Sequence, residues 1–238
     1  MGLSLVRELP AFGSLRLHAA VAAPGNSAVG RDSGELAGTA PNGVRISTDL
    51  AAALEGAGLA LDFSSAAAAS AHVRACAGAR VPLLLGTTGL GPQVHAAVAE
   101  AARLIPVLVT ANTSVGVTVL EELVRMAAVA LGEGFEIRIR DVHHAGKRDA
   151  PSGTALALGA AAAQAAGIQP ARINYGSERR GEVVGEHEVQ FIGPGESLSL
   201  GHSATDRRVF ARGALRAGGW LARQAPGRYA MGDALREK

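Results

Sequence analysis

The sequence predicts an α/β protein with two domains, in which a doubly wound, Rossmann-like domain precedes an α+β domain with an open mixed sheet. Up to about residue 112, short apolar segments alternate with Ala-rich helical segments roughly every 25–30 residues, which is typical of βαβ units. Beyond this point, strand-like segments alternate between apolar and polar residues, as expected for a sheet with one exposed face. The apolar content of 48% in 238 residues is ample for two cores.

The first domain is predicted from apolar runs, capping residues and prolines. Its strands read as uninterrupted apolar segments, as in a parallel sheet covered on both faces, and are expected over residues 15–22, 59–63, 81–85 and 106–109. Helices are expected over residues 2–9, 47–54, 64–78 and 92–103. The residues that end or begin them are Pro10, Ser47 or Thr48, Ser64 or Ser65, and Pro92. The Gly-rich residues 24–41 are predicted to form a loop.

In the second domain, residues 135–141 place Phe and Ile inward and Glu and Arg outward, which predicts a half-exposed antiparallel strand. Gly193-Pro194-Gly195 is predicted to be a hairpin turn. The remaining elements are helices over 116–131 and after residue 150, and strands over 172–177, 182–192 and 196–203. Asp206 caps a last helix to about residue 224. We expect residues 1–114 and 208–238 to form the first domain and residues 115–207 the second.

Composition narrows the function classes. The net charge of +2 comes from mixed charges without interleaved aromatic residues, so we expect no nucleic-acid partner. Cys76 is the single cysteine, which excludes an internal disulfide and a multi-cysteine metal site, and we expect no metal. Arg7 and Glu8 interrupt the first helix, which therefore lacks the apolar core of a signal peptide, and no segment is apolar enough to span a membrane. We expect a cytoplasmic protein.

Residues 143–154, His-His-Ala-Gly-Lys-Arg-Asp-Ala-Pro-Ser-Gly-Thr, combine proton-transfer groups, a cation and a helix start. His143 and His144 can transfer protons near neutral pH, and Lys147 can hold a carboxylate. Asp149 is the expected N-cap of the next helix, whose first N–H groups, at Gly153 and Thr154, can bind an anion. A solvated basic loop is the alternative, but the combination favours a site for an anionic small molecule.

Two further loops follow predicted parallel strands. Gly86-Thr87-Thr88-Gly89 follows the strand that ends at residue 85, and Thr110-Ala111-Asn112-Thr113 follows the strand that ends at residue 109. Ligands of open α/β sheets bind at this carboxyl edge. Ordinary turns are the alternative for both loops.

Residues 143–155 resemble the signature of the dihydrodipicolinate reductase (4-hydroxy-tetrahydrodipicolinate reductase) family, which is close to H-H-x-x-K-x-D-A-P-S-G-T-A. The resemblance extends to residues 30–38, 62–64, 86–89, 111–117, 185–187 and 202–214. It implies that NADH or NADPH reduces 4-hydroxy-tetrahydrodipicolinate to tetrahydrodipicolinate, in lysine and diaminopimelate biosynthesis. It also implies a dicarboxylate substrate and a homotetramer formed through the sheet of the second domain.

The same resemblance implies roles for individual residues. His143 is the acid/base, Lys147 the proton donor and His144 a substrate contact, while the amides of Gly153 and Thr154 bind a carboxylate. The implied cofactor contacts are Gly86, Thr87, Thr88, Thr110, Ala111, Asn112 and Thr113, although the family usually has a bulky residue such as Phe at the last position. His187 and His202 are interpreted as structural, and Arg207 as a hinge.

The N-terminus departs from the family pattern. Residues 1–9 resemble the last two residues of the family's Gly-rich phosphate loop and the helix after it. No G-x-G-x-x-G motif occurs in the sequence. We therefore expect either a start that was assigned too late or a truncated chain with weak cofactor binding. Ala22 stands where an acidic residue would contact the adenosine ribose, so the choice between NADH and NADPH stays open. Two alternatives remain: another nicotinamide-dependent oxidoreductase, or a non-catalytic dicarboxylate-binding remnant.

Overall fold

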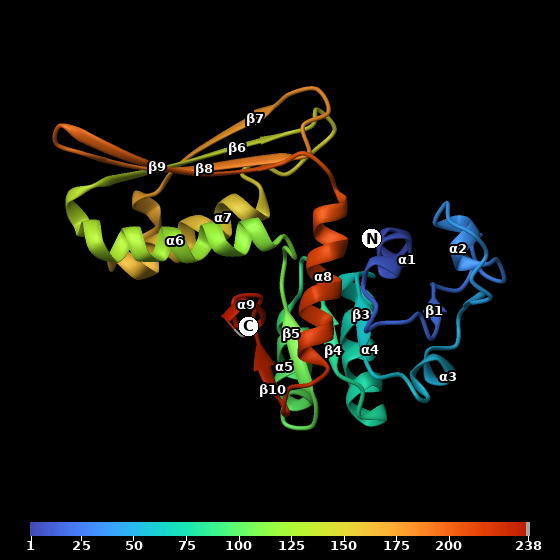
Figure 1. Ribbon diagram of the computed structural model, residues 1–238. Coiled ribbons are helices and arrows are strands. Elements are labelled where there is room, and N and C mark those ends of the chain that lie inside the picture. The colour runs from blue at the N-terminus through green and yellow to red at the C-terminus, as the bar shows by residue number, and fades with distance from the viewer. Residues whose placement is uncertain (237–238) are drawn as a thin grey trace. The chain divides into compact units, whose positions relative to one another are not determined.

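The protein consists of two compact units in a computed structural model that describes residues 1–236 (Figure 1). The first unit comprises Met1–Thr113 together with the segment from Phe210 onward, and the second comprises Ser114–Val209. The last long helix, α8 (Arg208–Leu221), therefore begins in the second unit and continues in the first. The predicted α/β architecture is confirmed.

A four-stranded parallel sheet forms the centre of the first unit, in the order β10-β5-β4-β3. Its strands are β3 (Ala60–Asp62), β4 (Leu83–Leu85), β5 (Pro106–Val109) and β10 (Gly227–Tyr229). Helices α4 (Ala66–Ala79) and α5 (Pro92–Ala101) contribute to a core with Leu83 and Val107, whereas Ala217 and Leu221 of α8 pack with Leu84 and Leu108. Both faces are thus covered, as predicted. The short, polar β10 and the terminal α9 (Asp233–Arg236) were not predicted.

The N-terminal part of this unit deviates from the prediction. Only Ala20–Val21 of the expected strand 15–22 forms a strand, β1, and it pairs in parallel with β2 (Ile46–Ser47). The expected helix start at residue 47 is wrong, because Asp49 caps α3 (Leu50–Leu54). The remaining short elements are α1 (Gly2–Glu8), a 3-10 turn η1 (Leu9–Ala11) and α2 (Ser33–Leu36), which lies inside the predicted loop.

The reason for the short β1 lies in the pairing of the sheet. Among the described residues, β1 hydrogen-bonds to β2 alone and β3 to β4 alone, so the parallel sheet is interrupted between β1 and β3. A strand is defined by its ladder partners, and an edge without a partner leaves its backbone groups unpaired. Apolar sequence alone therefore did not make residues 15–19 a strand.

The second unit is a mixed four-stranded sheet, in the order β7-β6-β8-β9, with two helices on one face (Figure 1). The strands are β6 (Glu136–His143), β7 (Asn174–Arg179), β8 (Gly185–Gly193) and β9 (Glu196–Ala204). The helices are α6 (Val115–Leu131) and α7 (Gly153–Ala166). Two 3-10 turns complete the unit: η2 (Gly132–Gly134) follows α6, and η3 (Pro170–Arg172) precedes β7. Strand β6 is antiparallel to β8, as predicted, but parallel to β7. The predicted hairpin between β8 and β9 is confirmed, and Gly195 has a φ of 84°.

Alternation along β6 places polar groups inside this unit. Ile137 and Ile139 face the helices within the core, and by the same period of two Asp141 and His143 face that side at the carboxyl end of the strand. Both polar side chains are buried. The candidate catalytic side chains of this unit thus lie where the apolar core ends and the loop to α7 begins.

Candidate active site

The imidazole ring of His143, the last residue of β6, is oriented by a hydrogen bond to a carboxylate. Its Nδ1 lies 2.9 Å from Oδ1 of Asp141, whose side chain is completely buried. An ionised carboxylate can only accept, so Nδ1 carries the proton in this pair and Nε2 is the free nitrogen of the neutral ring. A Cβ at Gly185 would lie 3.2 Å from Nε2, so the absence of a side chain there keeps space around this atom.

The carboxylate of Asp141 receives three further donors. They are the Ser177 hydroxyl at 2.7 Å, an Arg179 guanidinium nitrogen at 2.9 Å and the Ser152 backbone N–H at 3.2 Å. Burial by itself would raise the pKa of Asp141, but these hydrogen bonds, together with that from His143, outweigh it and lower the pKa. Asp141 is therefore ionised at neutral pH.

The balance of forces on His143 favours the neutral ring. Burial lowers its pKa, the hydrogen bond from Nδ1 to Asp141 opposes this effect, and the nearby positive charges of Lys147 and Arg179 lower the pKa further. The net pKa lies below the ordinary value for histidine. His143 can consequently accept a proton at Nε2 near neutral pH.

The loop after β6 brings a cation next to the start of α7. Lys147 Nζ lies 2.9 Å from Asp149 Oδ1, and this hydrogen bond is the main cause of a lowered pKa of Asp149, to which the Gly153 backbone N–H also contributes. The prediction that Asp149 is the N-cap of α7 is wrong. Ser152 is the cap, and its Oγ accepts the N–H of Ala155 at 3.1 Å, because this is the residue with extended backbone directly before the helix.

The structure therefore gathers the predicted residues of this segment around one helix start. His144 is half-buried, while Gly153 is exposed and has no atom within 4 Å of the position that a Cβ would occupy. Thr154 follows in the first turn of α7. A proton acceptor, an ammonium group and the first N–H groups of a helix can together bind an anion and move protons on it.

His187 and His202 lie on the same buried side of the sheet. The two residues are directly opposite in β8 and β9, and the rings of His143 and His187 are 5.1 Å apart, edge to face. The Nε2 atoms of His187 and His202 lie 3.3 and 3.4 Å from the hydroxyls of Ser152 and Ser114, the N-caps of α7 and α6. Burial is the main cause that lowers the pKa of His187, to about 4, so this ring is neutral at pH 7.

Asp141, Ser177 and Arg179 are the site residues that sequence reasoning missed. The first could have been found, because the alternation that turned Ile137 and Ile139 inward also places Asp141 inward, beside His143. The other two are contributed by β7, whose parallel pairing with β6 sets Ser177 opposite Asp141 and Arg179 opposite His143. No sequence pattern indicated that pairing.

In the first unit, the predicted loops lie at the carboxyl ends of the adjacent strands β4 and β5. A Cβ at Gly86 would lie 2.1 Å from the Phe63 ring, so only glycine fits there, and its N–H donates to the Asp62 carbonyl at 2.8 Å. Thr88 and Ala111 are exposed, while Thr87 is buried. Thr110 and Asn112 are partly buried and joined by hydrogen bonds of 2.6 and 3.1 Å, which shape the second loop.

Thr113 differs from the other members of the second loop. Its side chain is buried, and its hydroxyl donates to the Phe210 carbonyl at 2.6 Å. The side chain is thus turned into the protein and engaged there. A ligand at this loop would meet the main chain of Thr113 rather than its hydroxyl.

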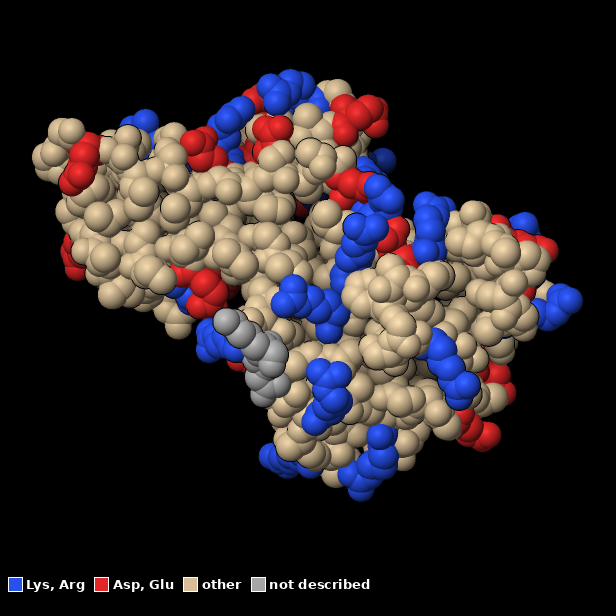
Figure 2. All heavy atoms as spheres, viewed as in Figure 1, with Lys and Arg blue, Asp and Glu red and all other residues tan. Residues whose placement is uncertain are grey.

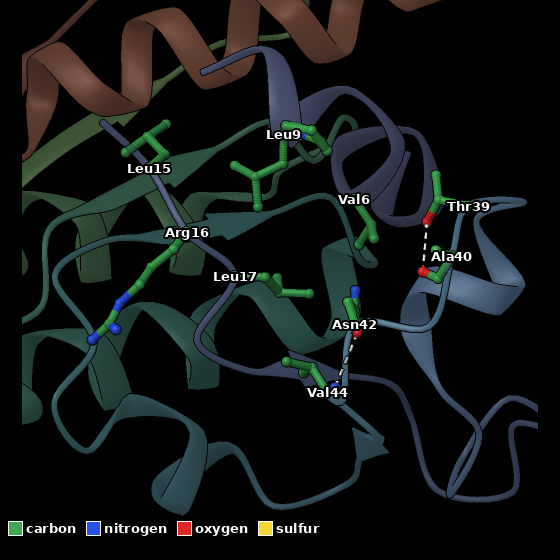
Figure 3. A pocket seen from close by; sticks show the side chains of 10 residues that line it. Val6, Leu9, Leu15, Arg16, Leu17, Thr39, Ala40, Asn42 and Val44 are labelled. Atoms are coloured by element: carbon green, nitrogen blue, oxygen red, sulfur yellow. Dashed lines mark hydrogen bonds between the residues drawn. The ribbon is translucent and has the colours of Figure 1, made fainter. Parts of the chain in front are cut away.

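A cavity of about 390 Å³ lies elsewhere in the first unit (Figure 3). The side chains of Val6, Leu9 and Leu17 border this hollow between α1 and the residues that precede β1. None of the predicted site residues lines it. Within residues 1–236, no group of three or more His, Cys, Asp or Glu side chains could hold a metal ion, and no helix is long and apolar enough to cross a membrane.

Comparisons with known proteins point to one family. Residues 1–113 match the family model described as dihydrodipicolinate reductase, N-terminus, and residues 116–235 match dihydrodipicolinate reductase, C-terminus. A 4-hydroxy-tetrahydrodipicolinate reductase of Anaeromyxobacter dehalogenans strain 2CP-1 is 46% identical over 99% of this chain and 93% of its own. The enzyme of that name from Thiobacillus denitrificans is 40% identical over 99% of this chain and 94% of its own.

Solved structures share the fold. The dipicolinate-bound dihydrodipicolinate reductase from Paenisporosarcina sp. TG-14 superposes with a TM-score of 0.80 at 18% identity, over 100% of this chain and 96% of that chain. The amine dehydrogenase from Mycobacterium smegmatis has a TM-score of 0.63 at 14% identity, over 97% of this chain and 92% of that chain.

The buried His187 predicts a pH-dependent stability. The pKa of His187 falls from 6.5 to about 4 on folding, because the folded protein disfavours the protonated ring. The unfolding free energy is therefore highest above pH 6.5 and decreases as the pH falls toward 4, by up to roughly 3 kcal/mol from this residue. We expect His187→Gln to flatten the decrease of the unfolding free energy between pH 7 and pH 4.5. Urea unfolding at several pH values measures this, with the exposed His95→Gln as control. Parallel pH profiles for both variants would contradict the assignment.

Proposed function

Because the chain belongs to the dihydrodipicolinate reductase family, we propose that residues 143–154 bind the substrate and transfer its protons, and that the loops after β4 and β5 hold the nicotinamide. The chain is an oxidoreductase that reduces 4-hydroxy-tetrahydrodipicolinate to tetrahydrodipicolinate with NADH or NADPH, in lysine and diaminopimelate biosynthesis. One hydride and one proton are added and one water is lost. We further propose a cytoplasmic location, which agrees with such a biosynthetic reaction.

The observation that carries the residue assignment is the arrangement around the start of α7. His143 presents Nε2 with its other nitrogen fixed by Asp141, and Lys147 lies in the turn that leads to the same helix. A dicarboxylate offers two negative charges to a cation and to helical N–H groups. The solved reductase with bound dipicolinate, itself a dicarboxylate, supports this choice of substrate class.

Asp149 indicates how a carboxylate is held. Its side chain contacts both Lys147 Nζ and the N–H of Gly153, the two groups to which we assign a substrate carboxylate. A substrate carboxylate that takes these partners replaces one negative charge by another, so the cation stays paired. The N–H of Thr154 and the ring of His144 are the proposed additional contacts.

Proton transfer is divided between two residues in this proposal. The neutral ring of His143 accepts a proton from the substrate at Nε2 and returns it to the departing hydroxide, which leaves as water. Lys147 donates the proton that is added with the hydride, as negative charge develops on the substrate ring. The pKa of His143, lowered mainly by burial, suits an acceptor near neutral pH. The ammonium group also stabilises the developing charge.

The first unit is the proposed dinucleotide-binding domain, and the second the substrate-binding domain. Gly86 supports cofactor binding at the loop after β4, because the absence of a side chain lets the Phe63 ring pack against the loop's main chain. The proposed contacts are Gly86, Thr87, Thr88, Thr110, Ala111, Asn112 and the main chain of Thr113. When bound, the reduced nicotinamide supplies the hydride.

We propose a homotetramer that forms through the open face of the second unit's sheet. The helices α6 and α7 pack on the other face of the sheet, and the open face carries the ion pair between Arg140 and Glu178 at 3.0 Å, among other charges. A different exposed surface lies on α6, where an apolar stripe is formed by Val119, Leu123, Met126 and Val129. Figure 2 shows mixed charges along the sheet side of this unit and few charges over α6.

Light scattering of the purified protein tests this assembly, and we expect the mass of four chains. Ser199 lies on the open face of β9, so Ser199→Arg should reduce the mass, because unpaired positive charge at an interface core is costly. Met126→Arg, on the exposed stripe, should leave four chains together. The opposite pattern would assign the contact to α6, and a single-chain mass for the unsubstituted protein would refute the tetramer.

Replacing Lys147 should affect turnover more than cofactor binding. We expect Lys147→Ala to lower kcat by about 10²–10⁴-fold, the usual effect of removing a proton donor. Because Lys147 belongs to the second unit, the dissociation constant of NADH measured by calorimetry should change little. Arg148→Ala, in the same loop but exposed, is the matched control. Near-normal turnover in Lys147→Ala would remove its assignment as proton donor.

A side chain at Gly153 should weaken substrate binding. A Cβ at this position meets no protein atom within 4 Å, so Gly153→Val should fold normally while its methyl groups obstruct a carboxylate at the N–H. We expect a raised KM, a smaller rise for Gly153→Ala, and an unchanged melting temperature. If the melting temperature falls while KM stays constant, the glycine has a structural role and no anion binds there.

A further inference from the structure

We propose that Asp141 is a positioning residue of the reaction, which fixes the nitrogen that His143 presents to the substrate and ties the start of α7 to the same carboxylate. This inference rests on the proposed function of His143 as the proton acceptor. Asp141 itself is completely buried and touches the substrate site only through its partners. Neither the sequence motif nor the predicted site includes it.

The geometry fixes the orientation of the carboxylate before substrate binds. Oδ1 accepts from His143 Nδ1 and from Arg179, each at 2.9 Å. Oδ2 accepts from the Ser177 hydroxyl at 2.7 Å and from the Ser152 N–H at 3.2 Å. Four donors from different positions saturate both oxygens, so the group cannot rotate without losing several hydrogen bonds.

The hydrogen bond to Oδ1 selects one tautomer of His143. With Nδ1 protonated, the lone pair of the neutral ring lies on Nε2, the nitrogen near Gly185, where no side chain obstructs it. Without an acceptor at Nδ1, the proton could occupy either nitrogen, and part of the population would present an N–H instead of a lone pair. Asp141 thus prepares the ring to accept a proton.

The same carboxylate also connects the segments around it. The Ser152 N–H belongs to the N-cap of α7, and Arg179, which ion-pairs with Asp141, also donates to the backbone carbonyl of Asp149. The acid/base residue and the proposed anion-binding helix start therefore share one anchor. A displaced anchor would move both groups relative to the substrate, and small displacements at a reacting centre cost rate.

Electrostatics adds a second effect. The charged or titratable groups that act on His143 are Asp141 on its own strand, Lys147 in the following loop, Arg179 on β7 and His187 on β8. Lys147 and Arg179 disfavour the protonated ring, and Asp141 is the group in this set that favours it. Loss of the negative charge should therefore lower the pKa of His143.

The test compares Asp141→Asn with His143→Gln and with the control Glu182→Gln in the 238-residue chain. Asparagine has one acceptor oxygen, so its NH₂ group must face either the two donors at Oδ1 or those at Oδ2. We expect Asp141→Asn to lower kcat by about 10²-fold or more, with KM changed only a few-fold, because Lys147 and the Gly153 N–H remain. Its activity should also persist to lower pH on the acidic limb of the profile. Glu182→Gln makes the same carboxylate-to-amide change at an exposed residue outside the site and should stay within about threefold of the unsubstituted enzyme.

The outcomes separate the two hypotheses. If His143→Gln retains normal turnover, the proposed role of His143 fails. If His143→Gln is inactive while Asp141→Asn has an unchanged kcat and an unchanged pH profile, the role of His143 stands and the positioning role of Asp141 fails. A loss of activity in Asp141→Asn without any displacement of the pH profile would also refute the tautomer argument.

A measurement on the unsubstituted protein avoids any folding defect of the variant. Long-range ¹H–¹⁵N spectra of uniformly labelled protein at pH 8 distinguish the two neutral tautomers of histidine, and His143→Gln assigns the signals. We expect the Nδ1-protonated form for His143. The Nε2-protonated form would show that Asp141 does not accept from this ring, and the proposal would be wrong.

Discussion

The buried carboxylate of Asp141 is the interaction on which the second unit's site depends. It joins the end of β6 to β7 through Ser177 and Arg179, and to the start of α7 through the Ser152 N–H. Burying a charge is costly unless it is fully hydrogen-bonded, and here every oxygen has two donors. The requirement to satisfy this one group therefore fixes the positions of several segments, and His143 is among its partners.

The second unit divides into an apolar end and a polar end. Phe191, Val189 and Ile139 pack with α6 and α7 in an apolar core, whose burial from water stabilises the unit. At the other end, histidines contact the N-cap serines of both helices: the buried His187 contacts Ser152, and the partly buried His202 contacts Ser114. Polar and titratable side chains at this end thus occupy positions that a protein core usually fills with apolar residues, as is common at functional sites.

In the first unit, backbone shape matters more than charge. The Phe63 ring occupies the space that a side chain at Gly86 would need, so the loop after β4 can keep its course only with glycine. Hydrogen bonds within the next loop, from Thr110 to Asn112, similarly define a main-chain surface at the carboxyl edge of the sheet. Such edges are where α/β sheets bind ligands.

The sequence by itself determined the α/β class, the order of nearly all elements and the segment that carries the chemistry, because hydrophobic period and capping are local properties. It could not determine how far residues 15–22 form a strand, since that depends on a ladder partner distant in the chain. It also led to the wrong cap for α7, Asp149 instead of Ser152, because both residue types cap helices equally well. The environment of His143 was decided by tertiary structure alone. Arg179 reaches Asp141 through the parallel pairing of two strands, and pairing between distant strands is set by burial of the whole sheet rather than by any local pattern.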